Sequence, residues 1–328
     1  MAVHLSGIQP SGLLHLGNYF GAIRQHVALS EQKGEHFYFI ADYHALTSSR
    51  DPEALRSYIR ETAITYLALG LDGDSACLFR QSDVPEVTEI AWLLGTVAGM
   101  GLLERATSYK DKIAKGLKPS VGLFTYPVLM ASDILAYGSD IVPVGKDQAQ
   151  HVEMAQDMAA SFNAAFDAEV FRRPEMLLSE EKSSRKVPGL DGQKMSKSYD
   201  NTIWLFETGK PLRKALNRIV TDSRPPTEPK NPDELLLFDL LNLFLDDGEF
   251  QQLKTSVREG GEGAPGYGDL KNRLAEGIED WFAPAREKRE LLLADTGEVD
   301  RILARGGEVA RERAASVRDR ALEASGLR

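Results

Sequence analysis

Two polar segments of the chain carry side chains that suit phosphate chemistry. The segment SGIQPSGLLHLGNY contains His15 and Asn18, and the segment QKMSKSYDN contains Lys194 and Lys197. His15 and Asn18 are three residues apart, so they share one face of a helical turn and can both reach phosphate oxygens. The two lysines can fold over a triphosphate and neutralise the charge on its α-phosphate and on the leaving pyrophosphate. Together the segments predict a nucleotide site.

The first segment lies between an expected strand and an expected helix. Gly7 and Gly12 allow close backbone approach or a positive φ, and Gly17 leaves room for a flat group over the helix N-terminus. The segment matches neither the G-x-G-x-x-G dinucleotide pattern nor the Walker pattern, which disfavours a dinucleotide oxidoreductase and a P-loop NTPase. A generic strand–turn–helix here, and an exposed Lys-Ser linker for the second segment, are the structural alternatives.

The elements around these segments alternate between strands and helices. With 328 residues, 42% of them hydrophobic, the chain can bury a sizeable core and form two domains. We expect strands at 3–7, 36–42, 76–81, 140–145 and 202–206, and helices at 17–32, 51–70, 85–98, 124–137 and 146–166. This alternation predicts an α/β fold with a doubly wound parallel, Rossmann-like sheet, in which ligands bind beyond the carboxyl ends of the strands.

The character of the chain changes in its second half. A polar stretch rich in Pro and Gly follows residue 170, and residues 233–245 and 269–326 are typical of helices. We therefore expect a C-terminal α-helical domain after the sheet domain.

Composition narrows the class of protein. A net charge of −10 argues against a protein that coats nucleic acid without specificity. The single cysteine, Cys77, cannot form an internal disulfide and is expected to be a buried structural thiol. The N-terminus lacks the apolar stretch of a signal peptide, and no apolar run has the length of a membrane span. We expect a cytoplasmic protein without a membrane partner.

Several longer strings resemble one known family. HLGN (15–18) is similar to the HIGH signature, and KMSKS (194–198) is similar to the matching signature, of class I aminoacyl-tRNA synthetases. The strings LSGIQPSGLLHLGNY, TYPVLMASDIL and DIVPVGKDQ resemble bacterial-type tryptophanyl-tRNA synthetases, and the resemblance covers the whole chain. It implies ATP, L-tryptophan and tRNA(Trp) as substrates, Mg²⁺ bound through the ATP phosphates rather than by a metal site of the protein, and a homodimer built on the sheet domain.

The resemblance also implies which residues bind ATP. His15, Asn18, Lys194 and Lys197 are the catalytic residues of the two signatures. In the same two segments, the resemblance adds Gln9, Pro10, Ser11, Gly17, Met195, Ser196 and Ser198 as ATP-binding residues. It implies that Gly145, Lys146 and Asp147 hold the ribose, that Val187 contacts the adenine, and that Lys112 is a third lysine that reaches the phosphates.

For tryptophan, the resemblance makes Asp133 the acceptor of the indole N–H. A carboxylate among apolar walls is costly unless it meets a donor, although an ordinary paired carboxylate is an alternative. A site that hydrogen-bonds such a donor rejects analogues without it by about 10⁴-fold or more. The resemblance further implies that Tyr126 and Gln148 hold the α-amino end of tryptophan and that Met130, Val142 and Val144 form the pocket walls. It places His44 at the pocket rim and makes Gly7 a further tryptophan-binding residue.

The implied reaction has two steps. The tryptophan carboxylate attacks the α-phosphorus of ATP, and the resulting adenylate then passes its acyl group to the 3′-terminal adenosine of the tRNA. The implied domains are a catalytic domain over 1–206 with its loop at 193–201, an anticodon-binding helical domain over 207–290, and a C-terminal helix over 291–328 that packs back on the catalytic domain.

Two features depart from the family, and three other functions stay open. Leu5 stands where many members have an aromatic residue, and VPGLDGQ, which precedes the KMSKS loop, differs from the common form. The rivals are a tyrosine-specific synthetase, a small nucleotidylyltransferase, and a non-catalytic synthetase-like RNA-binding protein. The pocket strings favour tryptophan, while the long helical half and the presence of His15 and both lysines disfavour the other two rivals.

Overall fold

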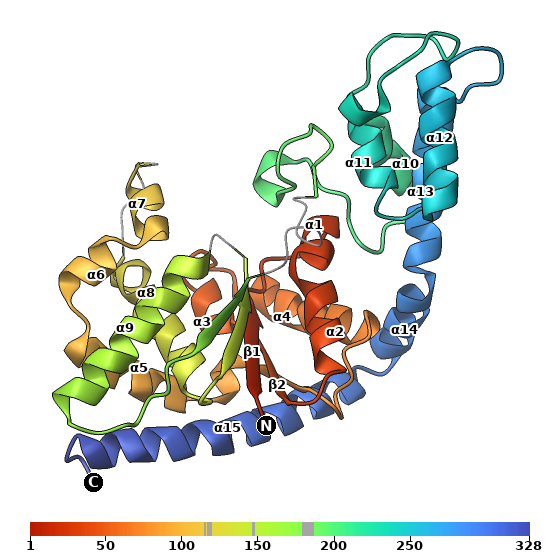
Figure 1. Cartoon of the computed structure of the whole chain (residues 1–328). Coiled ribbons are helices and arrows are strands. Elements are labelled where there is room, and N and C mark those ends of the chain that lie inside the picture. The colour runs from red at the N-terminus through yellow and green to blue at the C-terminus, as the bar shows by residue number, and fades with distance from the viewer. Residues whose placement is uncertain (115, 117–119, 146–147, 179–186) are drawn as a thin grey trace. The chain divides into compact units, whose positions relative to one another are not determined.

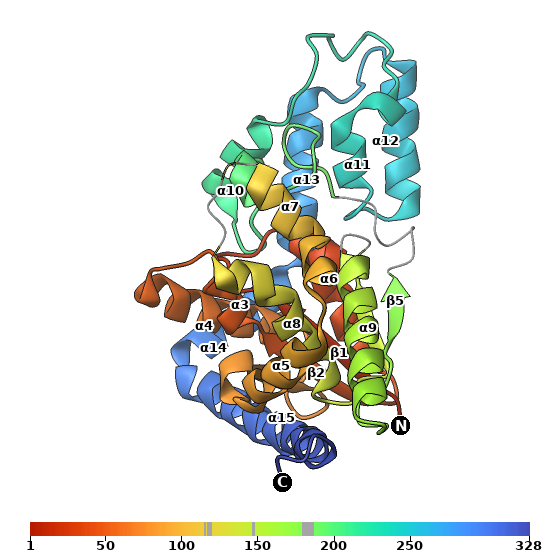
Figure 2. The same ribbon diagram turned by 90° about the vertical axis from the view of Figure 1, so that its left-hand side faces the viewer.

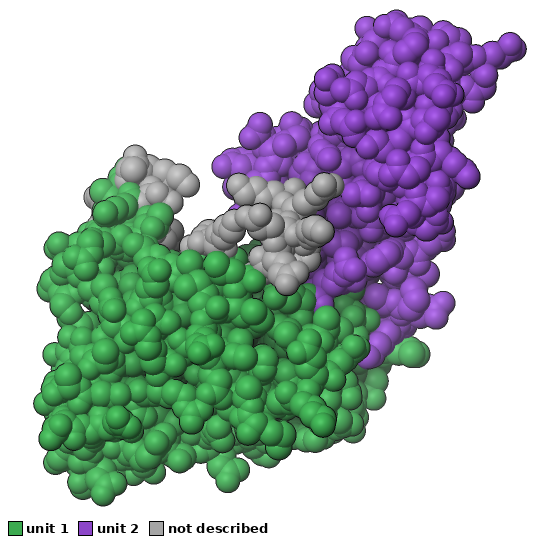
Figure 3. All heavy atoms as spheres, in the orientation of Figure 1, with its two compact units in different colours: residues 1–12, 25–179, 291–328 green, residues 13–24, 180–290 purple. Residues whose placement is uncertain are grey.

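The computed structural model describes the chain except residues 115, 117–119, 146–147 and 179–186. The chain forms two compact units, coloured separately in Figure 3. Unit 1 comprises residues 1–12, 25–179 and 291–328, and unit 2 comprises residues 13–24 and 180–290. The catalytic domain expected from the sequence covers residues 1–206 without a break. Residues 13–24 and 180–206 fall within that expected domain, but in the structure they belong to unit 2.

Unit 1 contains a parallel five-stranded sheet with the order β3-β2-β1-β4-β5. The strands are β1 Val3–Ile8, β2 Glu35–Ile40, β3 Cys77–Arg80, β4 Ile141–Val144 and β5 Glu175–Leu178. The chain adds strands to one side of β1 and then to the other, which confirms the predicted doubly wound fold and places a switch point between β1 and β4. The prediction missed β5 because this edge strand is short and largely exposed.

Helices cover both faces of the sheet. The helices of unit 1 are α2 Arg24–Ser30, α3 Asp42–Ala45, α4 Pro52–Ala68, α5 Glu86–Val97, α6 Met100–Glu104, α7 Thr107–Ala114, α8 Val121–Leu135, α9 Ala149–Ala165 and α15 Thr296–Ala324. α14 Ala283–Ala294 runs from unit 2 into unit 1. α5, α8 and α9 pack together on one side, and α2 and α4 lie on the other (Figures 1 and 2). α4 begins as predicted, because the Asp51 carboxylate accepts the N–H groups of Glu53 and Ala54 at 3.0 and 3.1 Å.

The long C-terminal helix α15 lies against β3 and α5 (Figure 1). Gly306 is the closest point of contact, since a Cβ there would overlap the backbone carbonyl of Leu78. The Cys77 thiol donates a hydrogen bond to the Gly306 carbonyl at 3.1 Å, and burial raises the pKa of Cys77 to about 12. Cys77 is half-buried rather than fully buried as predicted, and its thiol contacts the backbone of α15. Arg311 also pairs with the buried Glu86 at 3.0 Å, which ties α15 to the start of α5.

Unit 2 is mainly helical. Its elements are α1 Leu16–Asn18, a π-helical turn Tyr19–Ile23, 3₁₀ turns Lys197–Tyr199 and Pro232–Glu234, α10 Gly209–Asn217, α11 Leu236–Leu241, α12 Asp247–Glu259 and α13 Tyr267–Trp281. The expected helix over 233–245 is shorter because a 3₁₀ turn precedes it. The expected strand over 202–206 forms only an isolated bridge between Trp204 and His15.

An aromatic cluster anchors the HLGN helix to α13 within unit 2. The Tyr19 and Phe282 rings meet edge to face with centroids 5.0 Å apart, and Phe20 meets Phe244 in the same way at 5.6 Å. The Trp281 indole also donates a hydrogen bond to the Tyr19 hydroxyl at 3.3 Å. These contacts fix the turn that carries His15.

Among the described residues, no helix is both long and apolar enough to span a bilayer.

Candidate active site

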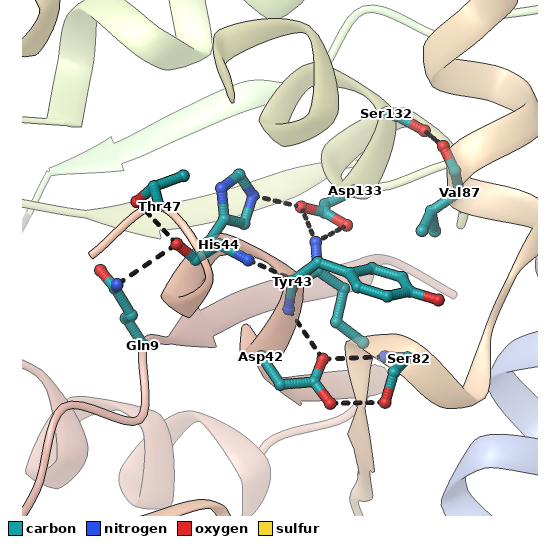
Figure 4. A network of polar contacts seen from close by, with 10 residues as sticks. Gln9, Asp42, Tyr43, His44, Thr47, Ser82, Val87, Ser132 and Asp133 are labelled. Carbon is teal, nitrogen blue, oxygen red and sulfur yellow. Dashed lines mark hydrogen bonds and ion pairs between the residues drawn. The ribbon is translucent and has the colours of Figure 1, made fainter. Parts of the chain in front are cut away.

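Unit 1 holds a buried carboxylate, Asp133, on α8. Asp133 is only 1% exposed, and the Gln81 Nε2 lies 2.8 Å from each of its oxygens. The His44 Nε2 lies 2.9 Å from Oδ2 (Figure 4). Because an ionised carboxylate only accepts hydrogen bonds, this histidine nitrogen carries the proton. Burial raises the pKa of Asp133, and the hydrogen bonds from His44 and Gln81 oppose that rise.

The network continues from His44 to other predicted residues. The His44 ring meets the Tyr126 ring edge to face, with centroids 6.1 Å apart. The Tyr126 hydroxyl contacts the His151 Nε2, and the His151 Nδ1 lies 3.0 Å from the Gln148 side-chain oxygen. Three elements therefore bring the predicted residues His44, Tyr126, Asp133 and Gln148 into one continuous network.

Sequence reasoning missed two members of this network, Gln81 and His151. Gln81 follows β3 directly, at the sheet edge where ligands bind, and its polar side chain at that point was the available signal. His151 lies on the first turns of α9, three residues after Gln148 and hence on the same face of the chain there.

The predicted pocket walls also belong to unit 1. Val142 is buried on β4, while Val144 and Met130 are half-buried against the core. Gly7 is exposed even though it lies in the central strand β1, and a Cβ at this position would overlap the Phe39 ring. A bare backbone at the carboxyl end of a central strand allows a ligand to approach closely.

A pocket opens beside this network, between α3 and the first half of α8. Its lining includes His44 and Tyr126, together with Arg50 and Leu129. His44, which lines this pocket, also contacts the buried Asp133 carboxylate.

Some predicted ATP residues also belong to unit 1. The Gln9 side chain lies 3.4 Å from both the His44 carbonyl and the Ser48 hydroxyl, next to the network (Figure 4). Pro10 is buried, Ser11 is exposed, and Gly145 directly follows β4. Lys146 and Asp147 lie outside the described residues. Lys112 belongs to α7, and its side chain is likewise outside the described part.

Unit 2 brings the two signature segments against each other. The Leu16 N–H donates to the Ile203 carbonyl at 3.0 Å, which holds the start of α1 against the chain that follows the KMSKS loop. A Cβ at Gly17 would lie 3.0 Å from the His15 Nδ1 and 3.4 Å from the Met195 Cβ. The glycine thus leaves room for the histidine ring and the loop methionine to pack closely.

The environment of His15 determines its charge. His15 is 7% exposed, and its Nδ1 has no hydrogen-bond partner among the described residues. Burial lowers the pKa of His15 to about 4, and the nearby Lys197 and Lys194 charges add to this effect. His15 is therefore neutral at pH 7 and can donate a hydrogen bond rather than contribute a positive charge. Asn18 has a structural role here, because its side-chain oxygen accepts the His15 N–H at 3.0 Å.

Asn201 organises the KMSKS loop. It is 2% exposed, its side-chain nitrogen donates to the Asp191 carboxylate at 2.7 Å and to the Lys194 carbonyl at 3.2 Å, and its side-chain oxygen accepts the Ser196 N–H at 2.8 Å. Sequence reasoning did not identify Asn201, although it ends the quoted segment.

Two buried side chains and two serines complete the loop. The Val187 carbonyl accepts the N–H of the buried Met195 at 3.3 Å, so Val187 supports the loop from below. The Ser196 and Ser198 hydroxyls lie 2.9 Å apart. Lys194 is exposed, whereas Lys197 is partly buried, and burial lowers the pKa of Lys197 to about 8.

Among the described residues, no group of three or more His, Cys, Asp or Glu side chains is placed to hold a metal ion.

Comparisons with known proteins agree with this arrangement. The sequence model of the tRNA synthetases class I (W and Y) matches residues 2–283. The chain is 55% identical to the tryptophan–tRNA ligase of Rhodopirellula baltica over 99% of both chains. It is 49% identical to the ligase of the same name from Fusobacterium nucleatum, over 98% of this chain and 97% of that one.

Solved structures give the same result. Tryptophanyl-tRNA synthetase from Campylobacter jejuni, complexed with ADP and tryptophan, superposes with a TM-score of 0.92 at 47% identity, covering 99% of this chain and 100% of that one. The enzyme from Mycoplasma pneumoniae superposes with a TM-score of 0.81 at 31% identity, covering 100% and 98%. The chain belongs to the class I tRNA synthetases of the tryptophan and tyrosine family, and it is an aminoacyl-tRNA synthetase.

Proposed function

We propose that this chain is a tryptophan–tRNA ligase that joins L-tryptophan to tRNA(Trp) at the expense of ATP. The observation that carries the proposal is the buried Asp133 carboxylate, which two side-chain donors hold at the inner end of the amino-acid region. An acceptor-only group in this place suits the indole N–H and gives phenylalanine nothing to bind. The identity to named tryptophan–tRNA ligases over nearly the whole chain supports the same substrate.

In the first step the tryptophan carboxylate attacks the α-phosphorus of ATP, and pyrophosphate leaves with the electrons of the broken P–O bond. The carboxylate is already ionised, so the step needs no general base. Catalysis then consists of positioning and of charge stabilisation. His15, as a neutral donor, and the Lys194 and Lys197 ammonium groups serve the phosphates. Mg²⁺ enters as the complex of ATP, bound to its phosphate oxygens.

In the second step a hydroxyl of the 3′-terminal adenosine of the tRNA attacks the carbonyl of tryptophanyl-adenylate. The ester forms, the mixed anhydride breaks, and AMP leaves. We assign anticodon binding to the helical region 207–290. We place the reaction in the cytoplasm, where tRNA is charged for translation.

In the amino-acid region, Tyr126 and Gln148 hold the α-amino end, while Met130, Val142, Val144 and Gly7 shape the ring pocket and His44 lies at its rim. For ATP we assign the cradle to Gln9, Pro10, Ser11, Gly17 and Asn18, the ribose to Gly145, Lys146 and Asp147, the adenine contact to Val187, and the third phosphate lysine to Lys112. Met195, Ser196 and Ser198 complete the loop.

The functional unit is a homodimer formed through unit 1. The support is two large exposed apolar side chains of unit 1, since Trp92 on α5 is 76% exposed and Met100 at the start of α6 is 63% exposed. Side chains of this size and exposure are typical of a protein–protein interface. Analytical ultracentrifugation of the Trp92→Glu variant, which is expected to shift toward monomer, tests this part.

Amino-acid-dependent pyrophosphate exchange tests the substrate. We expect exchange of labelled pyrophosphate into ATP with tryptophan and none above background with tyrosine or phenylalanine. Exchange that depends on tyrosine would favour the tyrosine-specific alternative within the same family. The absence of exchange with every amino acid would favour a non-catalytic RNA-binding protein.

A further inference from the structure

Gln81 stands out among the polar residues of unit 1 that no predicted role uses. It lies in the 3₁₀ turn Gln81–Asp83 that follows β3, and it is 0% exposed. A buried amide is stable only when its two N–H donors and its carbonyl oxygen are satisfied. The partners of Gln81 therefore show what it does.

The two ends of the Gln81 amide face different groups. Its oxygen accepts the Tyr43 N–H at 3.0 Å and the His44 N–H at 3.4 Å, both from α3. Its nitrogen faces both oxygens of Asp133. The reverse orientation would set the amide oxygen against a carboxylate and the NH₂ group against two backbone N–H groups. The partners thus determine the orientation, which directs the amide NH₂ group at both oxygens of Asp133.

Gln81 itself is held from behind. The neighbouring Ser82 N–H donates to the buried Asp42 carboxylate at 2.9 Å, and the Ser82 hydroxyl contacts the other oxygen of the same group (Figure 4). Asp42 also accepts the Tyr43 N–H at 3.0 Å, so one carboxylate joins the turn after β3 to α3. The Gln81 amide has little freedom to move away from Asp133.

Counted over the described residues, the hydrogen bonds to Asp133 leave one acceptor position open. An ionised carboxylate offers about four acceptor positions. Gln81 makes two of the observed contacts and His44 makes the third. The free position is suited to one further N–H donor, and the two fixed partners determine the direction from which that donor must come.

We propose that Gln81 is a positioning residue that fixes the Asp133 carboxylate so that it selects an amino acid with a ring N–H. The inference rests on the proposed function, because it takes the indole N–H of tryptophan as the fourth partner. Without Gln81 the carboxylate can rotate about its terminal bond, and within the described part of the chain His44 alone still donates to it. It then hydrogen-bonds the indole less well, while the shape of the ring pocket is retained.

The test compares tryptophan with 3-(3-benzothienyl)alanine, in which sulfur replaces the indole N–H with little change of shape. Pyrophosphate exchange gives kcat/KM for each amino acid, and the selectivity is the ratio of the two values. We expect Gln81→Leu to lower this ratio about tenfold, as loss of a positioned hydrogen bond would. The change should arise from a higher KM for tryptophan, with the KM for ATP and the kcat for benzothienylalanine unchanged.

Two further variants separate positioning from a general structural effect. Gln150→Leu makes the same substitution at a glutamine that also bonds across elements, accepting from Thr107 at 2.9 Å and donating to the Arg105 carbonyl at 3.2 Å, but without contact to Asp133. It should keep the wild-type ratio. Gln81→Glu keeps the size of the side chain and sets a second acid against Asp133, and it provides the test should Gln81→Leu not fold, as judged by circular dichroism.

The outcomes distinguish the inference from the proposed function. In one outcome, the wild-type protein prefers tryptophan to benzothienylalanine and the Gln81 variants keep the same kcat/KM ratio. That result would overturn the role of Gln81 and leave the tryptophan assignment intact. A wild-type protein that uses both amino acids equally would overturn the role of Asp133, and the role of Gln81 with it. Equal loss of selectivity in Gln150→Leu would also overturn the inference, because the effect would then be structural.

Discussion

The amino-acid region of unit 1 and the signature region of unit 2 are built in opposite ways. In the first, an anionic group is nearly fully buried and its oxygens already accept hydrogen bonds from Gln81 and His44. In the second, two lysines and a neutral histidine face each other, and the His15 Nδ1 is buried without a partner among the described residues. The first region thus centres on a carboxylate held by two side-chain donors, whereas the second centres on two cations and a neutral imidazole.

This difference matches two different tasks. Selecting a neutral ring by one N–H group requires an acceptor that is fixed in direction and shielded from water. Stabilising charge that develops on phosphates requires hydrogen-bond donors and cations placed close to those phosphates. Substitutions in the two regions should therefore change different kinetic constants, and the predictions below rely on this separation.

The largest effect is expected from Lys197→Ala in the signature region. Removal of one group that stabilises transition-state charge should lower kcat for tryptophan-dependent pyrophosphate exchange about 10²–10³-fold. The dissociation constant for tryptophan, measured by calorimetry, should not change. Lys210→Ala, at an exposed lysine of α10, is the matched control and should exchange like the wild type. Undiminished exchange in Lys197→Ala would remove the loop from the mechanism.

The next effect is expected from Asp133→Asn in the amino-acid region. Loss of the charged acceptor should cost about 2–3 kcal/mol, so kcat/KM for tryptophan should fall about 10²-fold while the KM for ATP stays the same. Asp157→Asn, on the exposed face of α9, controls for the substitution itself. An equal rise in both KM values would show that the two regions are not separate in function.

A smaller effect is expected from Asn201→Ala, which removes the side chain that frames the KMSKS loop. Three hydrogen bonds are lost, and we expect kcat of exchange to fall about tenfold because Lys197 is held less well. The KM for tryptophan should not change. Asn217→Ala, at an exposed position of α10, should leave all constants as they are. A selective rise in the KM for tryptophan would contradict the assignment of this loop to ATP.

The smallest effect concerns pH. Burial lowers the pKa of Lys197 to about 8, so its ammonium group is charged below that pH and is progressively lost above it. Since kcat/KM for ATP reports the ionisation of the free enzyme, it should decline by a few-fold as the pH rises through about 8. In Lys197→Arg the charge persists, and the decline near pH 8 should disappear. A decline that is the same in both proteins would exclude Lys197 as its origin.

Sequence patterns predicted helices and strands well where buried apolar residues recur at the spacing of a helix or a strand. The strands at β1 to β4 and the helices α4, α5, α8 and α9 follow from apolar runs and from caps such as Asp51. The patterns failed where burial is weak or partners are distant. β5 is a largely exposed edge strand, and Trp204 pairs with His15 through a single bridge that no local pattern reveals.

The same contrast applies to the site. The residues of the two signature segments and Asp133 have recognisable neighbours in the sequence, so motif resemblance could identify them. Asn201 and His151 lie in or next to quoted strings, but their hydrogen-bond partners become clear only in the folded chain. Gln81 lies outside every quoted string and takes part only because folding brings it within hydrogen-bond distance of Asp133. The neutral state of His15 follows mainly from burial and also from the nearby charges of Lys197 and Lys194, and the degree of burial does not follow from the sequence alone.

A crystal structure of the protein with tryptophan and a non-hydrolysable ATP analogue is the most direct measurement. It should show the triphosphate within about 3 Å of the His15 ring and of the Lys194 or Lys197 ammonium group, and the indole nitrogen at the same distance from an Asp133 oxygen. A nucleotide bound away from both signature segments, or an indole with its nitrogen turned from Asp133, would contradict the account.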